Sequence, residues 1–112
     1  MTDLINIHKH GAMGHISLNR PKALHALTLD MCHAMSAALA DWASDDTVKA
    51  VILDHAEGRG FCAGGDINLL RHSALNDGGE SGRAFFHDEY QLNHQMMTYD
   101  KPIVAFMDGI TM

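Results

Sequence analysis

Residues 61–67, with the sequence Phe-Cys-Ala-Gly-Gly-Asp-Ile, are the part of this 112-residue chain whose residue types best suit chemistry. They follow an apolar run and a short turn at 57–60, and they lead into 68–70, which can begin a helix. A strand, a glycine turn and a helix start can together aim backbone N–H groups at a ligand. Gly64 and Gly65 lack the Cβ atoms that would keep such a ligand away. The segment therefore predicts a site for a negative or developing-negative oxygen, which favours acyl chemistry.

Two thiols are the next candidates for chemistry. Cys62 could act as a nucleophile, but the sequence places no histidine partner beside it, so a packing role is favoured. Cys32 and Cys62 are 30 positions apart and form no CxxC motif. We expect two reduced thiols rather than a disulfide.

Nine histidines raise the alternative of a metal site. His8 and His10 share one face of a predicted strand, and His87 and His94 lie two turns apart on a predicted helix. No cysteine or carboxylate joins either pair at ligand spacing, and there is no HExxH motif. We expect no metal site and predict that many of these histidines are exposed.

Composition narrows the function classes. The net charge of −6 argues against nucleic-acid binding, and the 46% apolar content is enough for a folded core. No apolar run approaches the ~20 residues that a membrane helix needs. The start of the chain shows no secretion signal and no Arg-rich transit segment, so the prediction is a cytoplasmic protein that does not bind membranes.

The elements that position the glycine segment begin with a hairpin, predicted for residues 4–19. An amphipathic helix is predicted over 29–44, with Thr28 as its N-cap and Asp30 in its first turn. Residues 48–54 read as a short apolar strand covered on both faces.

Helices and strands also alternate in the predicted second half of the chain. A flexible loop is predicted at 73–82, a helix at 83–99 and a buried strand at 103–107. Phe86 and Tyr90 fall on one side of that helix, together with Met97. Alternating strands and helices predict an α/β layer with right-handed crossovers.

The last residues, 108–112, read as a turn out of a buried strand with no covering helix after it. A parallel strand is normally covered on both faces. We therefore expect residues 1–112 to be the N-terminal fragment of a longer domain.

Five blocks of the sequence, taken together, resemble the crotonase (enoyl-CoA hydratase/isomerase) superfamily. They run from one end of the chain to the other in the family's order and spacing, at residues 19–27, 49–53, 60–67, 101–105 and 108–109. The resemblance implies an α/β fold of the crotonase type, a spiral of ββα units, of which this chain holds only the N-terminal portion.

Within the superfamily, three segments resemble the 3-hydroxyisobutyryl-CoA hydrolase branch, namely 62–66, 85–93 and 108–112. Proteins of that branch continue with a glycine run after the position of Met112. The resemblance covers well under half of the family's domain.

The resemblance implies roles for the glycine segment. Gly65 corresponds to the position whose backbone N–H is one half of an oxyanion hole for the thioester carbonyl of an acyl-CoA. Asp66 and Ile67 correspond to positions that line the CoA arm. The other oxyanion donor of the family, and its catalytic Glu and Asp, lie beyond Met112.

Further substrate contacts are implied elsewhere. Lys22, Ala23 and Leu24 correspond to the turn near the adenine and phosphates of CoA. Glu89 corresponds to a substrate-contacting acid of the hydrolase branch. On residue type alone, Asp88 and Glu89 read instead as a solvated helix face.

The chain departs from the family pattern at three places. His25 stands where many relatives have Asn, which puts the details of the adenine-side turn in question. Phe61-Cys62 is the hydrolase-like variant of the motif, and Gly65 replaces the common Ala. None of these changes removes a backbone donor.

The function implied by the resemblance is hydrolysis of an acyl-CoA thioester of the 3-hydroxyisobutyryl-CoA type, as in valine breakdown. The alternatives are an enoyl-CoA hydratase or isomerase, or a non-catalytic fragment. We expect no metal or separate cofactor, because CoA is part of the substrate. The 112-residue chain is expected to be inactive alone, and the longer protein is expected to form homo-oligomers.

Overall fold

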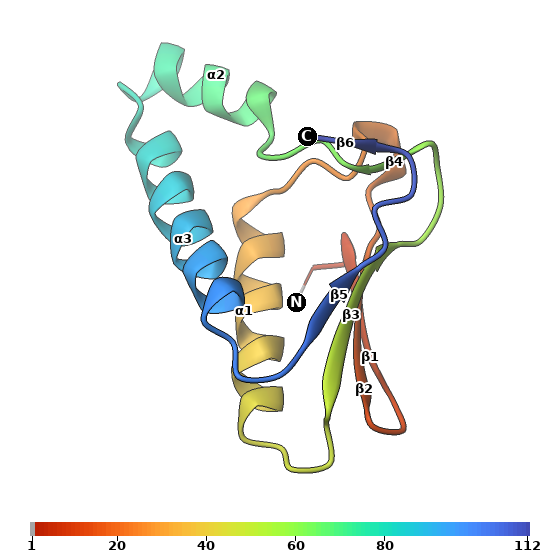
Figure 1. Ribbon diagram of the computed structural model, residues 1–112. Helices are drawn as coiled ribbons and strands as arrows, with labels where there is room; N and C mark the ends of the chain where they lie inside the picture. Colours follow the sequence, from red (N-terminus) through yellow and green to blue (C-terminus); the bar gives the residue numbers. More distant parts are fainter. Residues whose placement is uncertain (1) are drawn as a thin grey trace.

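The computed structural model describes residues 2–112, and its largest element is a four-stranded sheet of order β1-β2-β3-β5 (Figure 1). The predicted hairpin is present, with β1 (Ile5–His10) and β2 (Met13–Leu18) paired antiparallel. β3 (Ala50–His55) and β5 (Ile103–Ala105) continue the sheet in parallel. The parallel order follows from the helical connections between these strands.

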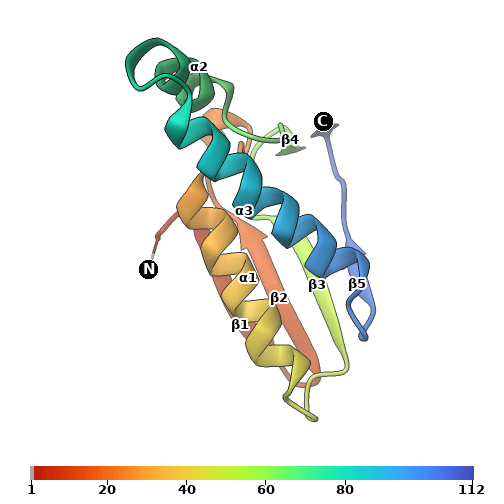
Figure 2. The same cartoon turned by 90° about the vertical axis from the view of Figure 1, so that its left-hand side faces the viewer.

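Helix α1 (Leu29–Ala43) forms where the apolar spacing predicted it. The Thr28 hydroxyl accepts a hydrogen bond from the Met31 N–H at 3.2 Å, which satisfies one free donor of the first turn. The apolar face of α1 lies against the sheet (Figure 2). Its buried side chains recur at helical spacing: Met31, Cys32, Met35, Ala38, Leu39 and Trp42.

The predicted flexible loop at 73–82 is wrong. Helix α2 (Ile67–Asn76) runs into this region, and α3 (Glu80–Met97) begins inside it. The Ser73 hydroxyl donates to Asp77 Oδ1 at 2.6 Å and accepts from the Gly82 N–H at 2.8 Å. These bonds satisfy the polar residues that made the segment look like a loop, so the helices are joined by a tight turn.

Helix α3 packs along α1 (Figure 2). Phe86, Tyr90 and Met97, which were predicted to lie together on one side of this helix, are exposed. The residues of α3 that enter the core are Phe85 and Leu92. A side-chain pair joins the two helices, because Ser36 Oγ donates to Gln95 Oε1 at 2.8 Å and Gln95 Nε2 returns a bond to the Ser36 carbonyl.

The strand predicted at 103–107 is shorter and is not buried. β5 ends at Ala105, and the side chains of Val104 and Phe106 are 47% and 54% exposed. β5 is the edge strand of the sheet in the described part of the chain, so no strand lies beside its outer edge. In the strand predicted at 48–54, Val48 and Val51 are buried, Lys49 is exposed and the other residues are half-buried, and the observed strand begins at Ala50.

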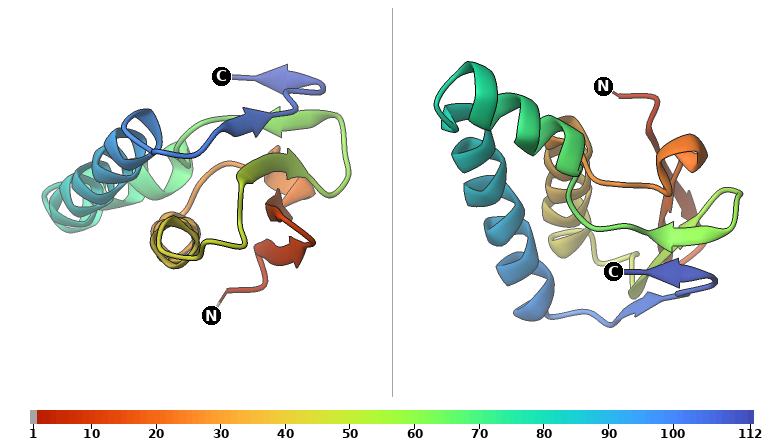
Figure 3. Two further views of the ribbon diagram at one scale, coloured as in Figure 1. Left: turned by 60° about the horizontal axis from the view of Figure 1, so that its bottom comes forward. Right: turned by 90° about the horizontal axis from the view of Figure 1, so that it is seen from above.

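A second, two-stranded sheet lies at one end of the larger sheet (Figure 3). It pairs β4 (Gly60–Cys62) in parallel with β6 (Ile110–Thr111). A single turn of 3-10 helix, η1 (Pro21–Ala23), lies at the same end. This end of the molecule gathers the glycine segment and the turn that precedes α1.

Candidate active site

Gly65 forms an isolated parallel bridge with Leu27. The Leu27 N–H donates to the Gly64 carbonyl at 2.7 Å, and the Leu27 carbonyl accepts from the Asp66 N–H at 3.0 Å. Both bonds to Leu27 are made by the neighbours of Gly65, and in a parallel bridge the residue between two such neighbours points its own N–H away from the partner segment. Among residues 2–112, no acceptor pairs with the Gly65 N–H. This donor is therefore free for a ligand, as an oxyanion site requires.

Two side chains of α3 lie directly against Gly65. A Cβ atom placed on Gly65 would be 2.9 Å from Phe85 Cε2 and 3.9 Å from Glu89 Oε2. The structure thus brings the predicted acid Glu89 beside the predicted oxyanion donor. Burial raises the pKa of the Glu89 carboxyl above its ordinary value. Glu89 is half-buried, unlike the solvated helix face that its residue type suggested.

Asp66 is the N-cap of α2. Its Oδ1 accepts from the Asn68 N–H at 2.9 Å and from the Leu69 N–H at 3.2 Å, and its Oδ2 lies 2.6 Å from Arg20 Nη1. Burial raises the pKa of Asp66, but the hydrogen bonds from Arg20, Leu69 and Asn68, together with the charge of Arg20, outweigh burial and leave the pKa below its usual value. Both carboxylate oxygens are therefore committed to the protein.

Ile67 differs from its neighbour Asp66. Its side chain is 75% exposed at the first turn of α2, immediately after the cap residue. An exposed apolar side chain next to Gly65 is free to contact a ligand. Of the two residues expected to line the CoA arm, Ile67 alone offers an uncommitted side chain.

The turn that contains Lys22, Ala23 and Leu24 lies beside the glycine segment. The Leu24 carbonyl accepts from the Ala63 N–H at 2.9 Å. Lys22 is exposed, so its ammonium group is open to a ligand. Leu24 adopts a left-handed conformation with φ 51°, which turns the chain sharply at the end of η1.

His25 follows that turn and is fully buried, whereas six of the nine histidines are exposed, in line with the expectation that many would be. Its Nδ1 accepts from the Arg20 N–H at 2.9 Å, and its Nε2 lies 2.7 Å from the Glu57 carbonyl. The ring is therefore neutral with its proton on Nε2, because one nitrogen must accept and the other must donate. His25 thus joins the loop at Arg20 to the loop at Glu57. The difference from many relatives at this position was noted from the sequence, but this role was not predicted.

The Cys62 thiol packs inside the site and has no basic partner. Its Sγ donates to the His25 carbonyl and accepts from the Gly64 N–H, both at 3.4 Å. Burial raises the pKa of Cys62, and burial raises that of Cys32 to about 12. Both thiols are free, and in the described chain neither bonds to an imidazole ring. This geometry suits packing rather than nucleophilic attack.

Among residues 2–112, no group of three or more His, Cys, Asp and Glu side chains is arranged to hold a metal ion. Nor does any helix in this part of the chain combine the length and the apolar composition that crossing a bilayer demands.

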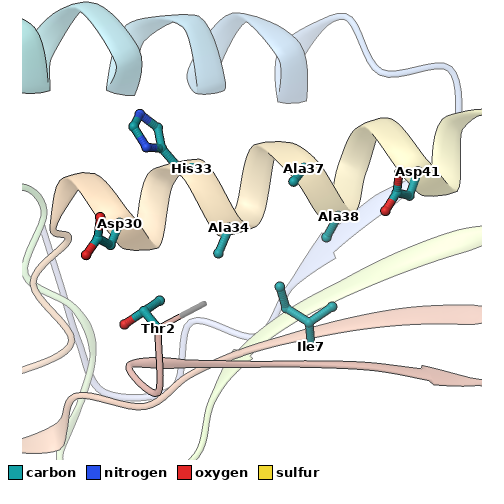
Figure 4. Close-up of a pocket in the computed structure, with 8 residues that line it drawn as sticks. All are labelled: Thr2, Ile7, Asp30, His33, Ala34, Ala37, Ala38 and Asp41. Carbon is teal, nitrogen blue, oxygen red and sulfur yellow. The ribbon is translucent and has the colours of Figure 1, made fainter.

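Of the pockets in the described part of the chain, one lies beside α1 and another lies near the glycine segment. The larger, about 480 Å³, lies between β1 and α1 and contains no predicted site residue (Figure 4). The smaller, about 220 Å³, lies between α2 and α3 and is lined by Leu27, Asp66 and Phe85 among others. The smaller pocket therefore adjoins the Leu27–Gly65 bridge.

β6 and the residue after it, Met112, run beside the glycine segment. The Met112 N–H donates to the Cys62 carbonyl at 2.9 Å. The Met112 carbonyl oxygen lies 3.6 Å from where a Cβ of Gly64 would be. Position 112 therefore adjoins the residue that precedes the free N–H of Gly65.

The sequence model of the enoyl-CoA hydratase/isomerase family matches residues 13–112. The mitochondrial 3-hydroxyisobutyryl-CoA hydrolase of Xenopus tropicalis is 45% identical over 93% of this chain and 27% of its own length. The human protein of that name is 41% identical over 95% of this chain and 27% of its own length. The chain thus spans about a quarter of these relatives, in their N-terminal part.

Solved structures of proteins from the same family have the same fold as this chain. A carnitinyl-CoA dehydratase from Mycobacterium thermoresistibile superposes with a TM-score of 0.91 at 46% identity, covering 97% of this chain and 32% of the other. An enoyl-CoA hydratase from Rhodobacter sphaeroides gives 0.86 at 39% identity, covering 96% and 32%. The predicted α/β crotonase-type fold is confirmed. The chain belongs to the enoyl-CoA hydratase/isomerase family.

Proposed function

We propose that the protein containing this segment hydrolyses the thioester of a short hydroxyacyl-CoA of the 3-hydroxyisobutyryl-CoA type, as in valine breakdown. The observation that carries the proposal is the free N–H of Gly65 beside the half-buried carboxyl of Glu89. The 41–45% identity to proteins named 3-hydroxyisobutyryl-CoA hydrolase supports the choice of substrate.

In the proposed reaction, water attacks the thioester carbonyl carbon, the carbonyl oxygen becomes negative, and the C–S bond then breaks to release the CoA thiol and the hydroxyacid. The Gly65 N–H donates to that oxygen, and one such donor contributes ~3–4 kcal/mol to the transition state. The second donor and the water-activating carboxylates belong to family positions after Met112. The place of Met112 beside Gly64 supports a second donor close to the first. We expect the 112-residue chain alone to be inactive.

The other site residues bind substrate in this proposal. Ile67 lines the CoA arm through its exposed side chain, and Asp66 holds the same stretch of backbone in place. The turn of Lys22, Ala23 and Leu24 faces the adenine and phosphates of CoA. Glu89 contacts the acyl group, and its raised pKa would let it carry a proton there more readily than an exposed glutamate.

A hydratase or isomerase is the second candidate function. The carnitinyl-CoA dehydratase at 46% identity favours it as strongly as the hydrolase relatives favour hydrolysis. Both reactions place the thioester oxygen on the Gly65 N–H, and they differ in the downstream carboxylates. A non-catalytic fragment is the third reading.

Neither a metal nor a separate cofactor takes part in the proposed reaction. The proposed partner is the acyl-CoA itself, without nucleic acid or membrane, and the longer protein is proposed to be a homo-oligomer. Cytoplasmic location stays a prediction, because several relatives are named as mitochondrial proteins. Cell fractionation with an antibody to this segment tests it.

A thiol-release assay tests the proposal. Protein expressed from the coding sequence read through and beyond Met112 is supplied with 3-hydroxyisobutyryl-CoA or with crotonyl-CoA. Thiol release from the first substrate, without hydration of the second, supports the hydrolase. Hydration of crotonyl-CoA without thiol release would replace it by the hydratase, and a stop codon directly after Met112 would support the non-catalytic fragment.

A further inference from the structure

We propose that Arg20 is a positioning residue for the Gly65 N–H, a role that rests on the proposed function. Arg20 lies 45 positions before Gly65 and does not bond to it directly. It acts through the two segments on either side of the Leu27–Gly65 bridge.

A single nitrogen of the Arg20 guanidinium spans those two segments. Nη1 lies 2.6 Å from Asp66 Oδ2 and 3.0 Å from the carbonyl oxygen of Ala26. Ala26 precedes Leu27, and Asp66 follows Gly65. The guanidinium therefore ties together the two segments whose pairing directs the Gly65 N–H away from Leu27.

The bridge itself consists of two hydrogen bonds, from the Leu27 N–H and from the Asp66 N–H, and it belongs to no longer ladder. The other bonds between the two segments, from the Ala63 N–H to the Leu24 carbonyl and from Cys62 Sγ to the His25 carbonyl, lie on the Cys62 side of Gly65, so Arg20 is the added tie on the Asp66 side. A neutral hydrogen bond contributes only ~1 kcal/mol net, whereas one to a charged group contributes ~1.5–3 kcal/mol. The ion pair is also shielded from solvent, since the Asp66 side chain is 8% exposed and that of Arg20 is 24% exposed.

Arg20 is itself held rigidly by its backbone. Its N–H donates to His25 Nδ1 at 2.9 Å, and its carbonyl accepts from the His25 N–H at 2.9 Å and from the Ala23 N–H at 3.1 Å. The side chain thus starts from a fixed point in the turn before α1. A fixed start and two fixed acceptors are what a positioning residue requires.

The test compares the 112-residue chain with Arg20→Gln, Arg20→Lys and the control Lys9→Gln. Lys9 forms an ion pair of 3.0 Å with Asp45 and offers a matched loss of one ion pair in an exposed part of the sheet. Hydrogen exchange is measured at single amides at low micromolar concentration, and the affinities for acetyl-CoA and for free CoA are measured on the same samples.

Arg20→Gln is expected to lower the protection of the Leu27 and Asp66 amides at least ~10-fold, which corresponds to the loss of about one charged hydrogen bond. It should also abolish any preference for acetyl-CoA over free CoA, because only the thioester needs the Gly65 N–H. Arg20→Lys should restore part of both, and Lys9→Gln should change neither. Wild-type protection of both amides in Arg20→Gln would overturn the proposal.

Two outcomes separate this inference from the proposed function. If the wild-type chain shows no preference for acetyl-CoA, the proposed function loses support, while the exchange data still decide whether Arg20 holds the bridge. If Arg20→Gln fails to fold, the wild-type chain is titrated with acid. Protection of Leu27 and Asp66, corrected for intrinsic exchange, should fall as the Asp66 carboxyl becomes protonated below the ordinary carboxyl range. Protection that is unchanged through that titration would overturn the role of Arg20.

Discussion

The ring of Phe85 lies so close to Gly65 that any larger residue at position 65 must move it. A Cβ at this position would be 2.9 Å from Cε2 and 3.2 Å from Cζ of the ring. Phe85 is buried at the inner face of α3, so its room to move is small. Helix α3 therefore sets the size of residue 65, and with it the approach to the free N–H.

Gly65→Ala should destabilise the chain by ~1–3 kcal/mol, because it forces the buried ring to shift. Phe85→Leu removes the ring atoms Cε2 and Cζ, so in that background Gly65→Ala should lower the free energy of unfolding by less. A double-mutant cycle in urea unfolding measures the coupling, which we expect to favour the double variant by ~1 kcal/mol. Strictly additive costs would mean that the contact with Phe85 does not limit residue 65.

Glu89 and Asp88 are neighbours on α3 whose carboxyl pKa values move in opposite directions. Burial raises the pKa of Glu89, so the folded state holds its proton more tightly than the unfolded state does. Stability from Glu89 is then present below the unfolded pKa and is lost as pH rises through the folded pKa. Glu89→Gln should therefore raise the melting temperature at neutral pH and give no gain at about pH 3.

Asp88 supplies the opposite control. Hydrogen bonds from His33 and then from His87 lower its pKa, with His33 Nε2 at 2.6 Å and His87 Nδ1 at 3.0 Å. Stability from Asp88 is present above the unfolded pKa and is lost as pH falls through the folded pKa. Asp88→Asn should lower the melting temperature at neutral pH and have little effect in acid. Shifts of the same sign in both variants would contradict these assignments.

His25→Ala should be costly, because it leaves the Arg20 N–H and the Glu57 carbonyl without their buried partner. Each such loss costs ~1–3 kcal/mol. His25→Asn should cost less, since Asn keeps one polar partner and tolerates the left-handed φ of 55° at this position. Chemical unfolding of the two variants gives the comparison. An Ala variant as stable as the Asn variant would show that the ring does not join these loops.

Gly109 is required by the pairing of β4 with β6. Its φ is +96°, and a Cβ there would lie 2.2 Å from the Arg59 carbonyl oxygen. Gly11, at the hairpin turn, has φ +60° with no atom within 4 Å of such a Cβ, so it isolates the cost of backbone strain alone.

Gly11→Ala should cost ~1 kcal/mol and leave β6 intact. Gly109→Ala should detach β6, so that the Met112 N–H loses its bond to the Cys62 carbonyl and its protection from hydrogen exchange. Retained protection of Met112 in Gly109→Ala would contradict this account of the second sheet.

Much of the fold could be predicted because its signals are local. The hairpin, α1 with its Thr28 cap, and the glycine turn each follow from patterns within about 15 residues. The turn between α2 and α3 could not be predicted, because the polar residues of this segment resemble those of a loop. The bond from the Gly82 N–H to the Ser73 hydroxyl, which holds the two helix ends together, leaves no local sequence signal. The exposure of β5 depends on which elements cover it, and no pattern inside the strand reports that.

The candidate site residues were predicted from the family resemblance, and their roles stay predictions. Gly65 and Glu89 are far apart in sequence, and only the packing of α3 brings them together. The commitment of Asp66 to Arg20 and the buried ring of His25 are likewise long-range contacts. Such contacts leave no trace in local spacing, so their discovery needed the folded chain.

The most direct measurement replaces the Gly65 N–H by an oxygen, a change that also weakens the Gly64 carbonyl as the acceptor of the Leu27 N–H. The chain is assembled by ligation at Cys62, with the amide between Gly64 and Gly65 replaced by an ester, and the matched control carries the ester at the N–H of exposed Gly78. Infrared spectra of [1-13C]acetyl-CoA then report the thioester carbonyl. The account predicts a shift to lower frequency with the all-amide chain and with the Gly78 ester, and no shift with the Gly65 ester. An equal shift with the Gly65 ester would contradict it.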